Sequence, residues 1–444
     1  MIIKNRVLCL PSKYHKNEWI VFDCDSLEIK RTDKHTAKII NCIANGEPTE
    51  QWESDEVKQI KRKLQALDTQ PQEVPQEKIR LILNTANTCN MNCGYCYANG
   101  GHYNSEEQLM SIDTAKRAID VFYANFSDIG SIKFIGGEPL VNWKVVKFVC
   151  DYVGKLYNEK SISSIPSFIV ATNGTILNEE IIEYSIKYNW RVGLSFDGRD
   201  DLHDLVRVDR KGAGTSKIIK DNISLWQQRT EGKCPSSINS CYSSVQESNG
   251  LSPADAAIYM RDELNVKKVN IVPVDSSKDS KYHLEAPERF GEIGADLEQL
   301  GEYEYSRYAI TKLKKLEKLL REKMTLSQHI CKAGITTFGV SVKGVISPCH
   351  LLTDVNGFYM GSVYDEEPFS TSSFTKIHTM LKNEDRMKNA KCSICFANRI
   401  CNGCIGGNLF RTGNAWESDP EICGIFKTAV TTLIQRISKD GEWF

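Results

Sequence analysis

Three cysteines stand close together in the sequence, at Cys89, Cys93 and Cys96. Their spacing, C-x3-C-x2-C, allows three thiolates from one loop to hold three irons of a [4Fe–4S] cube, which leaves the fourth iron for a ligand from outside the protein. Soft thiolates select iron–sulfur clusters or zinc over harder cations. Zinc is the weaker alternative because it needs a fourth ligand, and His102 stands alone in a polar loop.

Seven more cysteines lie in the C-terminal part of the chain and include two C-x2-C pairs. This spacing suits further iron–sulfur clusters, and it also suits a pair of zinc ribbons. The other six of the 16 cysteines lie in predicted strands and helices or at their edges, where they read as small core residues or ordinary thiols. The seven are Cys331, Cys349, Cys392, Cys395, Cys401, Cys404 and Cys423.

Length and charge limit the class of protein. A chain of 444 residues suits two or three domains. The formal net charge of −1 gives no overall attraction to nucleic acid or to an acidic membrane. No segment approaches the roughly 18 apolar residues of a membrane span, and residues 1–14 lack a signal-peptide core. We expect a cytoplasmic protein with no nucleic-acid or membrane partner.

Strands and helices alternate between residues 79 and 275, which predicts a parallel α/β sheet of the partial (β/α)6 TIM-barrel type. Reactive groups of such sheets gather at the C-terminal ends of the strands. The cysteine triplet follows the first of these strands. Strands are predicted at 80–85, 131–135, 167–171, 191–196, 237–242 and 267–274, with helices at 112–125, 143–158, 178–188, 216–228 and 253–264.

Two further domains are predicted on either side of this barrel, which covers residues 79–325. In residues 1–78, strands at 18–22 and 27–31 precede helices at 36–44 and 55–66, a pattern typical of a winged helix; a purely structural cap is the alternative. Residues 68–76 are expected to form a linker. Long helices are expected over 286–323. Residues 326–444 form the cysteine-rich part, with little regular pattern before a final helix at 426–438.

The triplet, with the aromatic Tyr95 just before its last cysteine, resembles that of the radical S-adenosylmethionine (radical SAM) superfamily. The resemblance implies that the amino and carboxylate groups of SAM chelate the open iron. It also implies that an electron from the cluster cleaves the sulfonium and yields a 5′-deoxyadenosyl radical. The cofactor supplies this chemistry, and the protein orients and shields it.

Supporting motifs follow in the order typical of the superfamily. A turn similar to the GGEP motif ends the second strand, and the resemblance implies that it contacts the SAM amino group. Ser195 and Arg207 keep the spacing of SAM-contacting residues in the maturase branch, although capping and surface pairing are the alternative. Asp197 and His203 receive no role. The implied cofactor-binding residues are Tyr95, Gly136, Gly137, Glu138, Pro139, Thr172, Asn173, Ser195 and Arg207.

The C-terminal cysteines resemble a SPASM domain, which holds two auxiliary [4Fe–4S] clusters in peptide-modifying radical SAM enzymes. By analogy, Cys331, Cys349 and Cys404 bind the first cluster, and Cys392, Cys395, Cys401 and Cys423 bind the second. Cys401 and Cys404 are one residue closer than the family pattern, which leaves the ligand partition open. Without a further cysteine after Cys331, the first cluster is expected to have an iron open to a substrate thiolate.

The N-terminal extension resembles a RiPP recognition element, the module that grips the leader of a ribosomally made precursor peptide by adding a strand to a sheet edge. Sulfatase maturases carry Asp directly after the cysteine matched by Cys349; here His350 stands there, as a candidate proton acceptor or as a residue that supports the cluster. The segment after the triplet resembles thioether-forming peptide maturases.

These resemblances imply an oxidoreductase-type enzyme that crosslinks a precursor peptide, most simply through a cysteine thioether. Carbon–carbon crosslinking, epimerisation, sulfatase-type maturation and a non-catalytic metal-binding regulator are the alternatives. The expected cofactors are three [4Fe–4S] clusters and SAM. The expected partners are the precursor peptide, held by its leader, and a reductant such as flavodoxin or ferredoxin.

Overall fold

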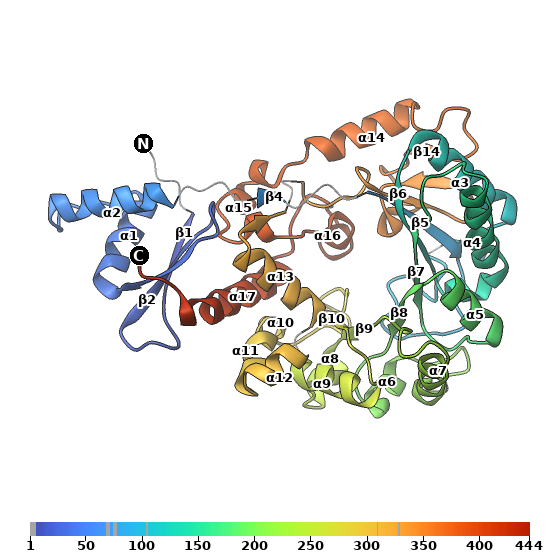
Figure 1. The fold of residues 1–444 in the computed structure, drawn as a ribbon, viewed down its shortest axis with the longest axis horizontal. Coiled ribbons are helices and arrows are strands. Elements are labelled where there is room, and N and C mark those ends of the chain that lie inside the picture. Colours follow the sequence, from blue (N-terminus) through green and yellow to red (C-terminus); the bar gives the residue numbers. More distant parts are fainter. Residues whose placement is uncertain (1–5, 68–71, 74–77, 104, 309, 327–328) are drawn as a thin grey trace.

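The computed structural model describes residues 6–67, 72–73, 78–103, 105–308, 310–326 and 329–444. A small N-terminal unit lies at one end of the molecule and an α/β unit at the other (Figure 1). The long helix α17 (Pro420–Ile437) lies beside the small unit. None of the described helices combines the length and apolar character needed to cross a bilayer.

The small unit is an antiparallel sheet of β1 (Val7–Pro11), β2 (Glu18–Asp23) and β3 (Ile29–Asp33), followed by α1 (Lys34–Asn45) and α2 (Ser54–Ala66). The Asp33 side chain caps α1 by accepting a hydrogen bond from the Thr36 backbone N–H. The two predicted strands and both predicted helices are confirmed. β1 was not predicted; it precedes the pattern that indicated a hairpin.

The central strand β2 separates two cores because its side chains alternate between the faces of the sheet. Val21 points to one face, where it packs with Ile40 of α1 and Ile60 of α2. Ile20 and Phe22 point to the other face and belong to a core shared with α17. The small unit is therefore joined to the C-terminal part of the chain through buried apolar surface.

The large sheet has nine strands in the order β10-β9-β8-β7-β6-β5-β12-β13-β14, and all pairs from β10 to β12 are parallel. The six predicted strands are confirmed, and the sequence motifs lie at their C-terminal ends. These strands are β5 (Ile79–Ala86), β6 (Ile129–Gly136), β7 (Ser167–Thr172), β8 (Arg191–Ser195), β9 (Ser237–Tyr242) and β10 (Val269–Pro273).

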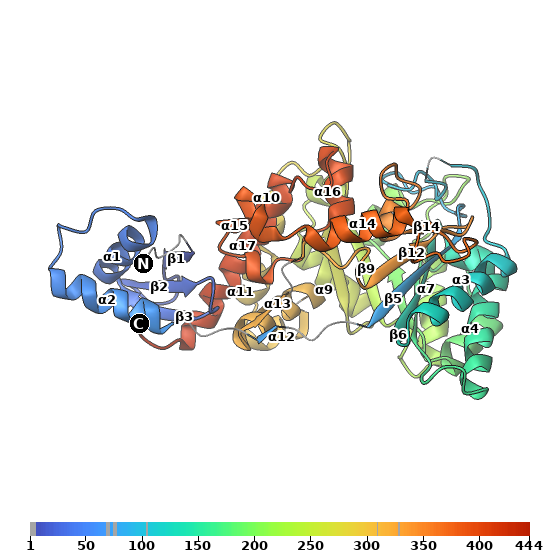
Figure 2. The ribbon, with the colours of Figure 1, turned by 90° about the horizontal axis from the view of Figure 1, so that it is seen from above.

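Helices cover one face of this sheet (Figures 1 and 2). Leu81 of β5 and Phe134 of β6 are fully buried beneath Ile119 and Val146. The crossover helices and the shorter helices after the strands are α3 (Ile112–Asn125), α4 (Trp143–Asn158), α5 (Glu179–Lys187), α6 (Asp200–Val206), α7 (Ser216–Arg229), α8 (Ser244–Ser248) and α9 (Pro253–Glu263).

The cysteine-rich part continues the same sheet, which the sequence did not indicate. β12 (Thr337–Val340) pairs in parallel with β5, and β13 (Val345–Ser347) and β14 (Gly361–Ser362) extend the sheet in antiparallel fashion. The sparse regular pattern expected here is therefore corrected: strands this short give too few residues for an alternation to be seen. The helices that follow are α14 (Ser372–Asn383), α15 (Ala390–Ser393) and α16 (Ile405–Thr412).

The long helices expected over 286–323 are four shorter ones: α10 (Pro287–Phe290), α11 (Ile293–Gln299), α12 (Glu302–Tyr308) and α13 (Thr311–Arg321). Gly301, with φ of 97°, separates α11 from α12 because a right-handed helix cannot continue through that conformation. Most of the predicted linker lies outside the described residues. Its described part, β4 (Gln72–Glu73), pairs with β11 (Met324–Thr325).

Candidate functional site

The cysteine triplet lies in the loop that leaves the C-terminal end of β5, and all three thiols are partly exposed. Burial raises the pKa of the Cys89 thiol to about 11, and the negative charges of Glu138, Cys93 and Cys96 contribute. The thiols are therefore near enough to repel one another as thiolates. Such repulsion falls when the thiolates bind a cationic centre, as cluster iron provides.

Backbone hydrogen bonds hold this loop against the segment that carries Arg207. The Asn92 N–H donates to the Val208 carbonyl and the Gly94 N–H donates to the Val206 carbonyl, both at 2.8 Å. Arg210 clamps the loop from outside: its Nε donates to the Cys89 carbonyl oxygen at 2.6 Å. Sequence reasoning missed Arg210, which carries no motif of its own.

The GGEP-like turn after β6 packs directly against the triplet loop. A Cβ on Gly137 would lie 2.4 Å from the Thr88 carbonyl oxygen and 2.7 Å from the Cα of Gly101. A Cβ on Gly101 would in turn lie 3.1 Å from the Cβ of Cys89. Glycine at both positions is therefore a condition for bringing the turn and the triplet together.

Glu138 is fully buried, and its carboxylate is used within the chain. It accepts hydrogen bonds from the Leu140 N–H at 3.0 Å, the Thr172 hydroxyl at 2.8 Å and the Asn173 N–H at 2.7 Å. Burial raises the pKa of Glu138 to about 7, although these donors lower it. Glu138 ties the ends of β6 and β7 together; the predicted contact of this residue with SAM stays a prediction.

Asn173 extends the same network to the triplet. Its Nδ2 donates to the Asn90 side-chain oxygen at 2.9 Å and lies 3.7 Å from the Cys89 sulfur. The turn after β6, the end of β7 and the triplet loop therefore form one hydrogen-bonded unit, in which Pro139 starts the short helix that follows Glu138.

Tyr95, Asp197 and Arg207 meet beside the triplet. The Tyr95 hydroxyl donates to Asp197, and Arg207 donates to the Tyr95 oxygen at 2.7 Å and lies 3.7 Å from the Asp197 carboxylate. Burial raises the pKa of Asp197, and the Arg207 guanidinium opposes this effect. Ser195 is the last residue of β8 and is partly exposed. Asp197, which received no role from the sequence, is the residue that positions Tyr95 and Arg207.

His203 supports this group from behind. Its Nδ1 accepts from the Asp197 N–H at 3.2 Å, so its Nε2 is assigned the proton and donates to the Thr215 hydroxyl at 3.1 Å. The Thr215 hydroxyl donates to the Arg207 carbonyl at 2.8 Å. Burial and the Arg207 charge lower the pKa of His203 to about 2, so the ring is neutral.

The structure brings together the three cysteines predicted to share the first auxiliary cluster. Burial raises the pKa of the Cys349 thiol to about 12, and the thiolates of Cys331 and Cys404 contribute. Cys404 begins α16, and its sulfur accepts the Gly407 N–H at 3.3 Å. These cysteines come from three separate segments, which only the fold could unite.

The four cysteines of the predicted second set also lie together. Burial raises the pKa of the Cys401 thiol to about 12, Arg386 lowers it, and Cys423, Cys395 and Cys392 raise it. Cys401 and Cys404 thus face different sets despite their short spacing. That these sets ligate clusters stays a prediction.

His350 follows Cys349 and is partly buried. Burial lowers its pKa to about 3, and the nearby cations Lys133 and Arg80 act in the same direction. Lys133 points to the side of β6 opposite the buried Phe134, and its charge reaches Cys349. Among the described residues, the buried His350 Nδ1 has no hydrogen-bond partner. The low pKa keeps the imidazole neutral and disfavours its taking up a proton, so the structure favours a supporting role beside Cys349 over that of a proton acceptor.

The donor groups of the triplet site fit an iron–sulfur cluster with SAM bound to it. Across the described residues, no three His, Cys, Asp or Glu side chains converge closely enough to hold a single metal ion. The triplet instead offers three soft, partly exposed thiols in one loop, near Arg207, which is 7% exposed and whose charge acts on Cys93. Within the described part of the chain, the buried Arg207 Nε has no acceptor, so it is available to an anionic ligand group.

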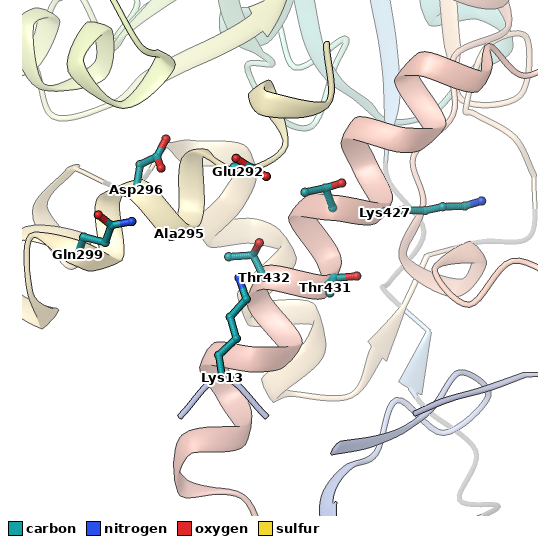
Figure 3. A pocket seen from close by; sticks show the side chains of 9 residues that line it. Lys13, Glu292, Ala295, Asp296, Gln299, Lys427, Thr431 and Thr432 are labelled. Atoms are coloured by element: carbon teal, nitrogen blue, oxygen red, sulfur yellow. The ribbon is translucent and has the colours of Figure 1, made fainter. Parts of the chain in front are cut away.

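A separate pocket of about 400 Å³ lies between α11, α17 and the turn after β1 (Figure 3). Lys13, Glu292, Asp296 and Thr432 are among its lining residues, and the side chain of Lys427, which also lines it, points away from the two carboxylates (Figure 3). None of the predicted site residues lines this pocket. It therefore does not belong to the cysteine sites.

Comparison with known proteins identifies the domain that carries the triplet. The model of the radical SAM superfamily matches residues 83–234. The chain is 32% identical to the radical SAM cyclopropyl synthase TigE of Paramaledivibacter caminithermalis over 168 residues, 33% of this chain and 34% of that protein. It is 29% identical to a cysteine-type anaerobic sulfatase-maturating enzyme of Clostridium novyi over 149 residues, 33% of this chain and 39% of that protein. The matches thus span between a third and two fifths of these relatives.

A solved structure agrees over more of the chain. Native anSMEcpe with bound AdoMet and Cp18Cys peptide has a TM-score of 0.64 and 20% sequence identity, and the match covers 82% of this chain and all of that one. This likeness supports the α/β fold with its parallel sheet. Residues 83–234 of this chain, with the triplet, the GGEP-like turn and Arg207, are a radical SAM domain.

Proposed function

We propose that this chain is a radical SAM enzyme that installs an intramolecular crosslink, a cysteine thioether, in a ribosomally made precursor peptide. The observation that carries the proposal is the gathering of Cys331, Cys349 and Cys404, of which Cys349 directly follows the β12–β13 hairpin that extends the sheet from β5. A second redox centre on the same chain would suit an oxidative crosslink, in which two hydrogens leave the substrate.

The chain's own residues have distinct roles in this proposal. Bound at the triplet, the cluster and SAM supply the 5′-deoxyadenosyl radical that takes hydrogen from the substrate. Arg207 and Tyr95, held by Asp197, orient the cofactor, and Glu138 fixes the strand ends beneath it. His350 supports the first cysteine set beside Cys349, because its low pKa of about 3 disfavours its taking up the proton that is released when the bond forms. The two C-terminal cysteine sets would hold the auxiliary clusters, which would supply an acceptor for the surplus electron.

The relatives support a peptide substrate. TigE is named a cyclopropyl synthase, and the sulfatase-maturating relative is named for its action on another protein. The structure of anSMEcpe contains a bound peptide. The N-terminal unit supports the same class, since an antiparallel sheet with an edge strand can bind an extended leader. An iron left open in the first auxiliary cluster would bind the substrate thiolate directly.

Anaerobic reconstitution with iron, sulfide, SAM and dithionite tests the first step. An enzyme releases 5′-deoxyadenosine, whereas a non-catalytic regulator does not. Coexpression with a precursor peptide encoded beside this chain's gene then tests the crosslink by mass spectrometry. Loss of two hydrogens with a blocked cysteine supports the thioether, and the same loss with a free cysteine indicates a carbon–carbon bond. An unchanged mass contradicts a crosslink and leaves epimerisation.

Sulfatase-type maturation is the second candidate, favoured by the likeness to the Clostridium novyi enzyme. His350 argues against it, because it stands where the resemblance places an aspartate in sulfatase maturases. Incubation with a sulfatase-derived cysteine peptide decides between them: formation of formylglycine would support this candidate. A His350→Ala variant with full activity would remove His350 from either reaction.

A further inference from the structure

The residues that follow α17 run along the edge of the N-terminal sheet. The Arg31 N–H donates to the Glu442 carbonyl and the Phe444 N–H donates to the Arg31 carbonyl, both at 2.7 Å. Arg31 and Trp443 form a parallel β-bridge in this way. Residues 441–444 thus add a short strand to β3, which would otherwise be an open edge.

Basic side chains hold this segment from both sides. Lys30 pairs with the Glu442 carboxylate at 2.5 Å, and the Arg31 Nε donates to the Gly441 carbonyl at 2.8 Å. Lys63 of α2 donates to the Phe444 carbonyl at 3.0 Å and lies 5.4 Å from the centre of its ring. The segment therefore lies in a groove between β3 and α2, which we call the β3–α2 groove.

The groove also has an apolar floor. Phe444 packs against the core that Val21, Ile60 and Leu64 form beneath α2. The Arg31 guanidinium lies 5.7 Å from the Trp443 ring, which is 53% exposed. The groove thus selects an extended strand with an acidic residue followed by aromatic residues.

The interactions that hold residues 441–444 can be replaced by those of another peptide. Exposed ion pairs such as Lys30–Glu442 contribute little to stability because water screens them. Backbone hydrogen bonds at a sheet edge can be replaced one for one by those of another extended peptide. An incoming peptide can therefore form the same backbone hydrogen bonds and ion pair that residues 441–444 form in the groove.

We propose that the β3–α2 groove is a docking site for an extended peptide with an acidic residue followed by aromatic residues, and that residues 441–444 occupy it as an internal competitor. Only the identification of the incoming peptide as a substrate leader rests on the proposed function. Because the competitor is tethered, its effective concentration is high, of millimolar order for short tethers. The full chain should therefore bind such peptides more weakly than a chain without it.

A trans-binding experiment tests this directly. The probe is a fluorescently labelled peptide of residues 437–444, and its binding is followed by fluorescence anisotropy. A chain ending at Asp440 should bind it at least tenfold more tightly than the full chain. The full-length Trp443→Ala/Phe444→Ala variant should also bind the probe more tightly than the unaltered chain. This variant tests the same proposal if the truncated chain does not fold.

Charge reversal in the groove provides the matched control. Lys63→Glu in the truncated chain should weaken probe binding at least tenfold, whereas Lys61→Glu, an exposed residue of the same helix, should leave it within twofold. Equal binding by full and truncated chains, or no binding by either, would overturn the proposal. Release of 5′-deoxyadenosine is measured in parallel, so loss of binding and loss of radical chemistry are told apart.

Discussion

At the scale of single residues, the site depends on side chains that hold other side chains. Asp197 carries no recognisable motif, yet it joins Tyr95 of the triplet loop to Arg207. The spacing of Ser195 and Arg207 was readable from the sequence through family resemblance. The hydrogen bond of Asp197 was not, because its partner lies a hundred residues earlier in the chain and only the fold brings the two together.

Asp197→Asn should weaken SAM binding. The change leaves the buried Arg207 charge without its counter-ion, and breaking a buried pair costs about 3–5 kcal/mol. We expect the Kd for SAM to rise at least tenfold in the reconstituted protein, measured by isothermal titration calorimetry. Asp201→Asn is the control, since Asp201 is exposed and pairs with Arg199. A Kd within twofold of the unaltered protein would contradict the role of Asp197.

His203 should make the fold sensitive to acid. Its pKa is about 2 in the folded protein, against about 6.5 for an exposed histidine. The unfolded chain therefore binds a proton below about pH 6.5 that the folded protein does not, and stability falls by about 1.4 kcal/mol per pH unit in that range. Above about pH 6.5 His203 is neutral in both the folded and the unfolded chain, so this loss of stability does not occur there.

Denaturant unfolding at pH 7.5, 6.0 and 5.0, chosen to bracket the histidine range of about 6.5, measures this effect. His203→Asn should flatten the loss of stability between pH 6 and 5, because its side chain does not titrate there. His35→Asn, at an exposed position of α1, should leave the slope unchanged. Equal slopes for the unaltered protein and His203→Asn would show that His203 does not cause the acid sensitivity.

At the scale of elements, the parallel strands were predictable and the cysteine-rich strands were not. Six strands with crossover helices produce a long pattern of alternating strand and helix segments in the sequence. β13 has three residues and β14 has two, which is too short for such a pattern to be recognised. The cysteine partition followed from resemblance alone. The fold explains it: Cys401 precedes α16 and Cys404 begins it, so the turn between them sends the two thiols to different sets.

This partition predicts how cysteine substitutions combine. Cys401→Ala and Cys404→Ala should each remove about four of roughly twelve irons, one cluster of three. Their double variant should lose about eight irons, because the sites are independent. The Cys349→Ala/Cys404→Ala pair should lose no more than either single variant. Iron analysis after anaerobic reconstitution measures this; a loss of only about four irons in the Cys401→Ala/Cys404→Ala variant would show that both cysteines bind the same cluster.

At the scale of the whole molecule, the N-terminal unit is part of the C-terminal core. Phe22 lies in the core that α17 completes, and Arg399, which stands between Cys395 and Cys401 in the sequence, pairs with Asp25 at 3.0 Å. The sequence indicated separate domains because composition and the linker separate them. Contacts between residues several hundred positions apart leave no periodic signal in either segment.

Phe22→Ala should therefore loosen α17 at a distance. Truncating a buried phenylalanine costs about 3–5 kcal/mol, and Phe22 shares its core with Leu433 of α17. Hydrogen exchange of amides in residues 420–437 should accelerate at least tenfold, as followed by mass spectrometry. Ile60→Ala, which empties the core on the other face of the sheet, should leave α17 unchanged. Equal protection in both variants would show that the two units are independent.

The continuity of β5 with β12 has a consequence for electron flow. β5 runs toward the triplet, whereas β13 runs in the opposite direction toward Cys349, so the two cysteine groups lie toward opposite ends of one hydrogen-bonded ladder. A ladder of this kind resists bending and shear. The sheet thus sets the separation between the triplet and Cys349 at folding, and clusters held at both places would be kept that far apart.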